Sequence, residues 1–258
     1  MAPDVTLLVL TAASIGFVHT LLGPDHYLPF AALSKARAWS TRRTVVITSL
    51  CGVGHVLSSI IIGAVGIAAG TTVERLVGIE AFRGDIAAWL LFGFGLAYTA
   101  WGLKRALRGS SHSHEHFHAD GTRHAHDHDH RLAPHLHPHG LAAGPGGAPV
   151  IERVEPVAGS TALAVTPWAL FIIFLFGPCE PLIPVLMYPA SHASWLAILM
   201  VCLAFGIATL VTMLAVVLLV RRGLQSVDLH GFERWSHAIA GSTIALCGVG
   251  ILVLGHGH

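Results

Sequence analysis

Long apolar stretches alternate with short polar segments along most of this chain. A helix needs about 20 apolar residues to cross roughly 30 Å of hydrocarbon, and six stretches reach that length. The predicted spans are Val5–Leu33 (interrupted at Gly23-Pro24), Thr44–Gly70, Asp85–Leu107, Leu163–Pro189, Trp195–Val220 and Glu233–Gly255. We therefore predict an all-α membrane protein of six transmembrane helices, with the lipid bilayer as its surroundings.

Composition supports this class. Of the 258 residues, 53% are hydrophobic and only 11% are charged, whereas a soluble domain carries roughly 25% charged residues. The four cysteines lie in apolar segments without zinc-knuckle spacing. The sequence has neither a nucleotide-binding loop nor a His-Glu-x-x-His motif. We therefore expect no enzyme, no prosthetic group and no nucleic-acid partner.

The basic residues are distributed unevenly between the predicted loops. All but two of the 15 Lys and Arg residues lie in the first, third and fifth loops; the exceptions are Arg75 and Arg83 in the second. Basic loops stay on the cytoplasmic side of a membrane. We therefore expect an integral plasma (inner) membrane protein with both termini outside and the long third loop in the cytoplasm.

A short motif occurs twice, 154 positions apart. The copies read Gly23-Pro24-Asp25-His26 and Gly177-Pro178-Cys179-Glu180. Weaker matches between the halves, such as Cys51 with Cys202, suggest two repeats of three helices at 1–110 and 161–258, separated by an insertion at 111–160. An odd number of spans inverts the second repeat, and transporters built this way bind their substrate near the midplane, between broken helices.

Each Gly-Pro pair predicts a broken helix. Proline ends or kinks a helix, and glycine past one helix followed by proline at the start of the next is the favoured order. Asp25, Cys179 and Glu180 would then lie in the first turn of a new half-helix, whose free N–H groups stabilise anions.

Six side chains in the apolar segments are candidate metal ligands. Polar groups at membrane depth usually mark a binding site or path, and His, Cys, Asp and Glu suit divalent transition metals. On a straight helix His19 and His26 would lie about 10 Å apart along the axis. Either the break therefore folds the segment back, or the two histidines serve successive sites on a path. The candidates are His19, Asp25, His26, His55, Cys179 and Glu180.

The insertion between the two repeats is rich in histidine. Its composition cannot bury a core, so we expect disorder. Such dense imidazoles bind transition metals, which makes the segment an accessory metal loop, although a passive or pH-sensitive linker is the alternative. The histidines are His112, His114, His116, His118, His124, His126, His128, His130, His135, His137 and His139.

The stretch from Gly16 to His26 resembles the His…Asp-His signature of nickel/cobalt permeases. The histidine-rich loop looks like that of the NicO-type efflux branch, within the broader LysE-like transporter superfamily. The resemblance implies a polytopic permease in which His19, Asp25 and His26 recognise Ni²⁺ or Co²⁺. The family's importers usually have eight spans, whereas this chain has six and a Gly-Pro inside the motif.

Two other functions remain open from the sequence. The second motif resembles membrane proteins that pass electrons between thiols with a Cys-Pro pair in each half, but Asp25 stands where that scheme needs a cysteine. An anion or organic-solute exporter of related topology is the other alternative. The leading hypothesis is alternating-access transport of Ni²⁺ or Co²⁺, with Zn²⁺ as a further candidate, in the efflux direction. Protons are the expected coupling ion, and an oligomer is compatible with the sequence.

Overall fold

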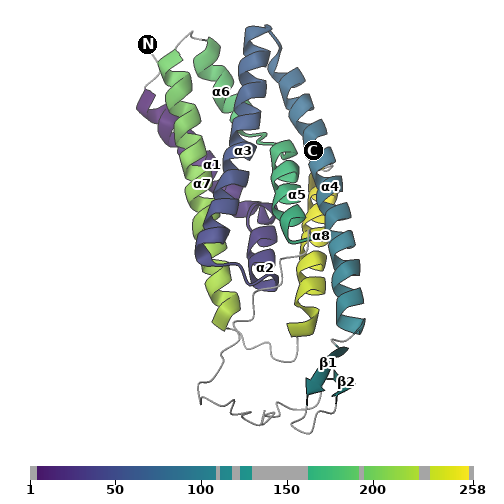
Figure 1. Ribbon diagram of the computed structural model, residues 1–258. Helices are drawn as coiled ribbons and strands as arrows, with labels where there is room; N and C mark the ends of the chain where they lie inside the picture. The colour runs from purple at the N-terminus through teal and green to yellow at the C-terminus, as the bar shows by residue number, and fades with distance from the viewer. Residues whose placement is uncertain are drawn as a thin grey trace.

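The computed structural model describes residues 5–108, 111–117, 123–129, 162–191, 195–226 and 233–255. Helices dominate these residues and form one elongated bundle (Figure 1). The helices are α1 (Val5–Leu22), α2 (Leu28–Ala36), α3 (Thr41–Ala68), α4 (Val73–Arg108), α5 (Ala162–Phe176), α6 (Leu182–Ser191), α7 (Trp195–Ser226) and α8 (Ser236–Gly255). Single 3-10 turns, η1 (Pro24–His26) and η2 (Glu233–Trp235), precede α2 and α8.

Within the described residues, five helical segments are long and apolar enough to cross a membrane. They contain α1, α3, α4, α7 and α8. The sixth predicted span is divided into α5 and α6, which are 15 and 10 residues long, and each is shorter than the roughly 20 residues that a span needs. Large apolar side chains such as Leu7, Leu22 and Trp195 are exposed on the outside of the bundle, as expected of surfaces that face lipid.

Both predicted helix breaks are present. Helix α1 ends at Leu22, directly before Gly23-Pro24, and α5 ends at Phe176, directly before Gly177-Pro178. The proline of the first break starts the 3-10 turn, which leads into α2. Figure 1 shows α1 and α2 descending from the end marked N, whereas α5 and α6 ascend toward that end. The two broken segments therefore run in opposite directions through the bundle.

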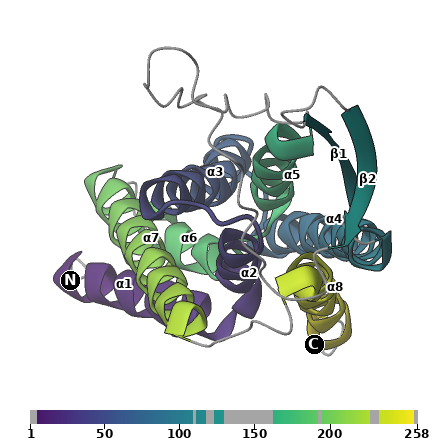
Figure 2. The same cartoon turned by 60° about the horizontal axis from the view of Figure 1, so that its bottom comes forward.

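The short helices lie inside a ring of longer ones. In the turned view, α2 and α6 occupy the centre, surrounded by the longer helices (Figure 2). Phe30 of α2 meets Phe174 of α5 edge to face, with ring centroids 4.7 Å apart. This contact between fully or nearly fully buried rings brings the second half of one broken segment against the first half of the other.

Helices α4 and α8 pack closely along their length because glycines line the contact. A Cβ on Gly95 would lie 2.7 Å from the Cα of Ala245, and one on Gly241 would lie 2.8 Å from the Cα of Thr99. Small residues allow helix backbones to approach in this way, and membrane bundles use them at their tightest contacts. This pair forms one wall of the bundle (Figures 1 and 2).

Helix α4 begins earlier than the sequence predicted. We expected the third span to start at Asp85, but the helix starts at Val73. Glu80 and Arg83, which lie in this added part, are 0% and 9% exposed and form an ion pair. Arg75 and Arg83 therefore both lie in α4, and the connection between α3 and α4 carries no Lys or Arg. A paired charge costs much less to bury than an isolated one, which explains why the helix continues through both residues.

The described part of the histidine-rich insertion contains two strands, β1 (Ser111–Phe117) and β2 (Arg123–Asp129). They pair antiparallel, with His112, His114 and His116 opposite His128, His126 and His124. The sequence predicted no regular structure here. His118, His130, His135, His137 and His139 lie outside the described residues.

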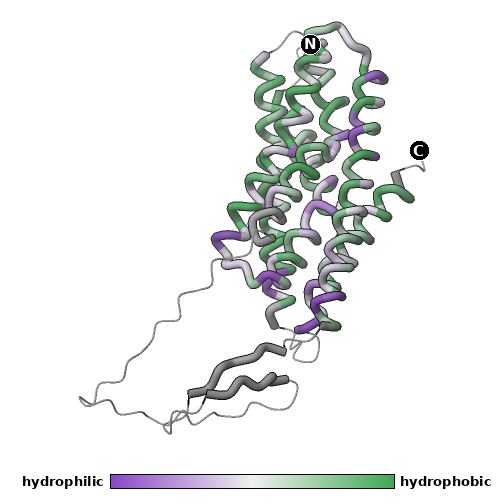
Figure 3. The backbone as a smooth tube through the Cα atoms, turned by 45° about the vertical axis from the view of Figure 1, so that its right-hand side comes forward, coloured by the Kyte–Doolittle hydropathy of each residue, from purple (hydrophilic) through white to green (hydrophobic). Residues whose placement is uncertain are grey.

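Hydrophilic residues gather at the end of the bundle from which the β1–β2 hairpin extends (Figure 3). Side chains at the α2–α3 connection and at the end of α7 bind each other there: Arg221 donates to the carbonyl of Trp39 at 2.7 Å, and Lys35 donates to the carbonyl of Leu224 at 3.0 Å. We refer to this region as the basic end of the bundle.

Candidate metal centre

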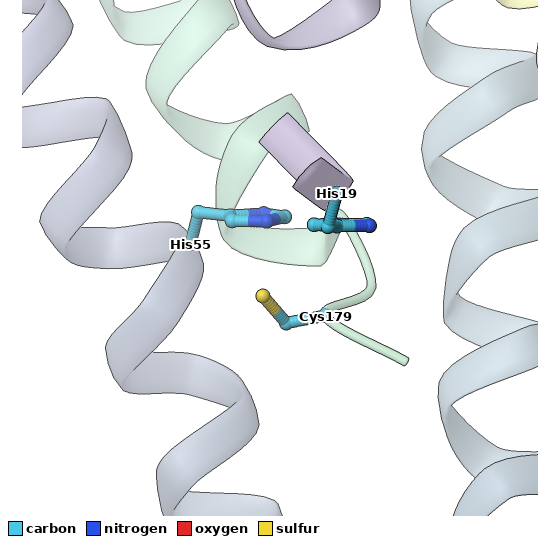
Figure 4. Close-up of side chains that lie close together, drawn as sticks. All are labelled: His19, His55 and Cys179. Atoms are coloured by element: carbon cyan, nitrogen blue, oxygen red, sulfur yellow. The ribbon is translucent and has the colours of Figure 1, made fainter. Parts of the chain in front are cut away.

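The two helix breaks meet inside the bundle next to α3. His19 lies in the last turn of α1 and His26 in η1, while Cys179 follows α5. His55 reaches the same place from the middle of α3. Figure 4 shows that the side chains of His19, His55 and Cys179 point toward one another. The fold therefore brings together groups that are up to 160 positions apart in the chain.

The first break folds the chain back on itself. The Gly23 amide donates to the carbonyl of His19 at 3.0 Å, and the His26 amide donates to the carbonyl of Gly23 at 3.1 Å. The imidazole rings of His19 and His26 consequently lie with centroids 4.9 Å apart, instead of the roughly 10 Å of a straight helix. Of the two arrangements that the sequence left open, the structure has the folded-back one.

His55 is held in one orientation by a backbone carbonyl. Its Nδ1 lies 3.3 Å from the carbonyl oxygen of Phe174. A carbonyl can only accept, so Nδ1 carries the proton and the Nε2 of a neutral ring keeps its lone pair. The ring is 3% exposed and its centroid lies 5.1 Å from that of His26. A hydrogen bond from the other ring nitrogen to a carbonyl is the usual way to fix the tautomer of a metal-binding histidine.

His26 is oriented by the same principle. Its Nδ1 lies 3.2 Å from the carbonyl of Gly23 and 3.3 Å from a carboxylate oxygen of Asp25. Both partners accept, so the proton sits on Nδ1 and the lone pair on Nε2. Asp25 thus pairs with the protonated ring nitrogen of His26, and not with the nitrogen that carries the lone pair. The structure gives this carboxylate the position of an orienting group for His26.

Three side chains present ligand atoms to one another at short range. One atom from each of His19, His55 and Cys179 lies within 4.8 Å of the other two. Tetrahedral ions with bonds of about 2.0–2.3 Å hold their ligand atoms roughly 3.3–3.8 Å apart. Side-chain movements of about 1 Å would close the group around an ion. Cys179 is fully buried, at 0% exposure.

Unpaired nitrogen atoms mark the same place. The Nε2 atoms of His19, His26 and His55 are buried and have no hydrogen-bond partner among the described residues. Buried polar atoms are nearly always satisfied, so three exceptions on neighbouring rings require an explanation. Nitrogen lone pairs beside a thiol form a donor set that suits Ni²⁺, Co²⁺ or Zn²⁺ and does not suit Mg²⁺ or Ca²⁺. We therefore treat His19, His55 and Cys179 as a candidate metal centre, with His26 beside it but outside the group of close ligand atoms.

Both motif glycines leave room for a histidine of the centre. A Cβ on Gly23 would lie 2.5 Å from the Nδ1 of His26, and a Cβ on Gly177 would lie 2.9 Å from the Nδ1 of His55. Gly23 has φ −89° and ψ 93°, an extended conformation. The space that it provides, not its backbone freedom, explains its place here.

Asp25 also lies beside two cavities. A cavity of about 30 Å³ is lined by Asp25, His55 and Pro178, among others. A larger one of about 410 Å³ lies between the first break and α8, where Leu28 and Cys247 contribute to its wall together with Asp25. The small cavity is large enough for one water molecule. Asp25 therefore stands between the candidate centre and a wider space at the side of the bundle.

Glu180 does not take part in the group. It is exposed and is absent from the ligand atoms that lie close together in the described structure. The turn that follows Cys179 accounts for this: the Leu182 amide donates to the carbonyl of Cys179 at 2.9 Å and α6 begins at once. Neighbouring positions at a helix start point in different directions, so Cys179 and Glu180 cannot both face the centre.

A buried ion pair beside the second break was missed by the sequence analysis. Glu80 accepts a hydrogen bond from the Cys179 amide at 3.1 Å, and Arg83 donates to the carbonyl of Leu175 at 2.8 Å. Arg83 had been counted only as a loop charge, and Glu80 had not been considered. The available signal was an acidic and a basic residue three positions apart in an apolar stretch, a spacing that places both on one side of a helix.

No known family, curated protein or solved structure matches this chain. The function must therefore be argued from the centre itself.

Proposed function

We propose that this protein transports divalent transition-metal ions across a membrane, with Ni²⁺ and Co²⁺ as the first cargoes to test and Zn²⁺ as the third. The observation that carries the proposal is the convergence of two unpaired imidazole nitrogens and one thiol inside an apolar bundle, from His19, His55 and Cys179, with the ring of His26 packed against both imidazoles. Such groups are costly at membrane depth and mark ion pathways. The ion is the substrate and needs no other cofactor.

The ligand set favours a cation over an anion or organic solute. An anion site would present N–H donors, whereas His26 and His55 have their Nδ1 protons bound by oxygen atoms and present lone pairs. The thiol adds a soft donor. The exporter of anions or organic solutes is therefore the weaker candidate.

Alternating access between two inverted repeats is the proposed mechanism. If α1–α4 correspond in order to α5–α8, the contact of α1 with α7 has its counterpart in the contact of α5 with α3. The contact of α2 with α8 likewise has its counterpart in the contact of α6 with α4. All four contacts are present. The opposite directions of the two broken segments agree with such an exchange (Figure 1). In this arrangement the two breaks meet near the midplane, as in other inverted-repeat transporters.

Proton exchange would couple the movement of the ion. Imidazole and thiol groups must be deprotonated to bind a metal, so binding releases protons and protonation expels the ion. An efflux cycle that takes up protons from outside as it releases metal follows from this chemistry. The basic end of the bundle would face the cytoplasm of a cell with an inner membrane, and the histidine-rich insertion would collect ions there.

The geometry offers less support for a thiol–disulfide relay. Such a relay needs two cysteines within bonding distance, with Cα atoms below about 7 Å. The four cysteines are free and buried, and the metal-binding groups close to the thiol of Cys179 are His19 and His55. Asp25 occupies the position at which the relay would need its second cysteine.

Metal uptake into proteoliposomes tests the proposal. Ni²⁺, Co²⁺ and Zn²⁺ are offered separately to wild type, His55→Ala, Cys179→Ser and a variant lacking 112–139, and Cys202→Ser serves as the matched thiol control. We expect flux that the two centre variants abolish and the control retains. Flux that survives loop deletion makes the insertion accessory. An absence of metal flux in either orientation, together with redox exchange at Cys179, would contradict the proposal and favour the relay.

A further inference from the structure

Helix α4 contributes no ligand to the candidate centre, yet it holds both chain ends of the second break. Glu80 and Arg83 are three residues apart, form an ion pair and are almost fully buried. One carboxylate oxygen of Glu80 accepts from the Arg83 guanidinium, and the other accepts from the Cys179 amide at 3.1 Å. The guanidinium in turn donates to the carbonyl of Leu175 at 2.8 Å.

The two charges match the polarity of the chain ends that they contact. The carbonyls at the end of α5 lack helical partners, and the amides before α6 are equally unpaired. Arg83, a cation, satisfies a carbonyl, and Glu80, an anion, satisfies an amide. Charge-assisted bonds of this kind are about twice as strong as neutral ones. The pair therefore fixes the distance and orientation between the end of α5 and Cys179.

Two serines of α3 complete the network. Ser59 donates to Glu80 at 2.9 Å, and Arg83 donates to the hydroxyl of Ser58 at 2.8 Å. Both serines lie one turn after His55 on the same helix. The network thus joins α3, which carries a histidine of the centre, to the segment that carries its thiol.

We infer that Glu80 and Arg83 are positioning residues that set the place of the Cys179 thiol relative to the imidazoles. The inference rests on the proposed metal site, but the position of the Cys179 backbone can be measured without metal. By contrast, the first break is held by bonds within its own segment, such as that from the Tyr27 amide to the carbonyl of Pro24 at 3.3 Å. The second break is anchored to a neighbouring helix.

A charge swap separates positioning from simple stabilisation. The variant Glu80→Arg/Arg83→Glu keeps an oppositely charged pair at the same spacing, so a purely structural pair would be restored. It also places a cation beside the Cys179 amide and a carboxylate beside the Leu175 carbonyl, which reverses both contacts. The variant Glu80→Gln/Arg83→Gln removes both charges together and leaves no buried charge unpaired. Glu74→Gln, an exposed change in the first turn of α4, is the control.

The first readout is the Cys179 amide in full-length protein labelled with ¹⁵N-cysteine and reconstituted in lipid nanodiscs. Four amide signals are expected from the four cysteines, and Cys179→Ser identifies the relevant one. We expect that signal alone to shift in the double-glutamine and swapped variants, while the control leaves it in place. An unchanged signal in both variants overturns the inference, whether or not metal binds.

The second readout is the thiolate-to-metal charge-transfer absorption on titration with Co²⁺. This absorption reports sulfur ligands only, so the cysteine-free insertion does not contribute. Second-shell changes typically cost 10–100-fold in metal affinity, and we expect that loss in the swapped and double-glutamine variants. Wild-type affinity in the folded swapped variant refutes the positioning role. If wild type shows no such absorption, the metal site itself is contradicted. In that case the Cys179 amide signal alone tests whether Glu80 and Arg83 position the chain at Cys179.

Discussion

The substitution Gly177→Ala should disable the candidate centre through one histidine. The added Cβ would lie 2.9 Å from the Nδ1 of His55, 3.2 Å from its Cε1 and 3.1 Å from the carbonyl oxygen of Phe174. Carbon atoms reach favourable contact at about 3.5–4.0 Å, so the ring must retreat by roughly 0.6 Å. The carbonyl belongs to the last turn of α5 and has less freedom to move than the ring.

That displacement is large compared with what a metal site tolerates. Ligand distances in working sites stay within about 0.2 Å of their ideal values. The retreat also lengthens the 3.3 Å contact between His55 and Phe174, which fixes the tautomer. We therefore expect affinity for Co²⁺ to fall 10–100-fold, which corresponds to about 1.4–2.8 kcal/mol.

The assay is Co²⁺ titration followed by thiolate-to-metal absorption in nanodiscs. Gly93→Ala is the matched control, because a Cβ on Gly93 meets nothing within 4 Å. A double-mutant cycle with His55→Ala isolates the cause, since two changes that act through one group are not additive. The reasoning is refuted if Gly177→Ala binds like wild type, or if its full penalty persists when His55 is already absent.

Three further expectations follow from the same geometry. Asp25→Asn should lower Co²⁺ affinity about 10-fold without removing the thiolate absorption, because it weakens the orientation of His26; an unchanged affinity would exclude the orienting role. Gly95→Ala should lower bundle stability by about 1–3 kcal/mol, measured by unfolding in detergent, because its Cβ would collide with the backbone of Ala245; wild-type stability would show that the helix contact is looser. Cys202→Ser should leave metal absorption and flux unchanged, and a loss of either would place a second thiol in the path.

The helix breaks could be predicted because their causes are local. Proline after glycine ends a helix wherever it occurs, and α1 and α5 stop at Leu22 and Phe176. The closeness of His19 and His26 could not be predicted, because it depends on the hydrogen bonds of the turn that follows Gly23. The meeting of Cys179 with His55 depends on how α3 packs against the second break, which no local pattern encodes.

The start of α4 could not be predicted from the sequence for a different reason. A hydropathy reading treats Glu80 and Arg83 as two separate penalties and starts the span after them, at Asp85. In the structure they neutralise each other and satisfy the backbone of another segment. The cost of burying a charge depends on its partner, and the partners here include groups nearly 100 positions away. The six-helix inverted repeat likewise stays a prediction, because α5 and α6 are each too short to span alone.

The side chains of the candidate centre are divided unequally between the halves of the chain. The first half supplies the imidazoles of His19 and His55, with His26 beside them, and the second half supplies only the sulfur of Cys179. In the proposed transporter, a motion that separates the halves would break a single bond and leave the nitrogen ligands together. That bond is also the one that hard cations cannot form well. The sulfur of Cys179 would thus determine both which ion is bound and when it is released. An ion that fails to bind sulfur would never draw the two halves together.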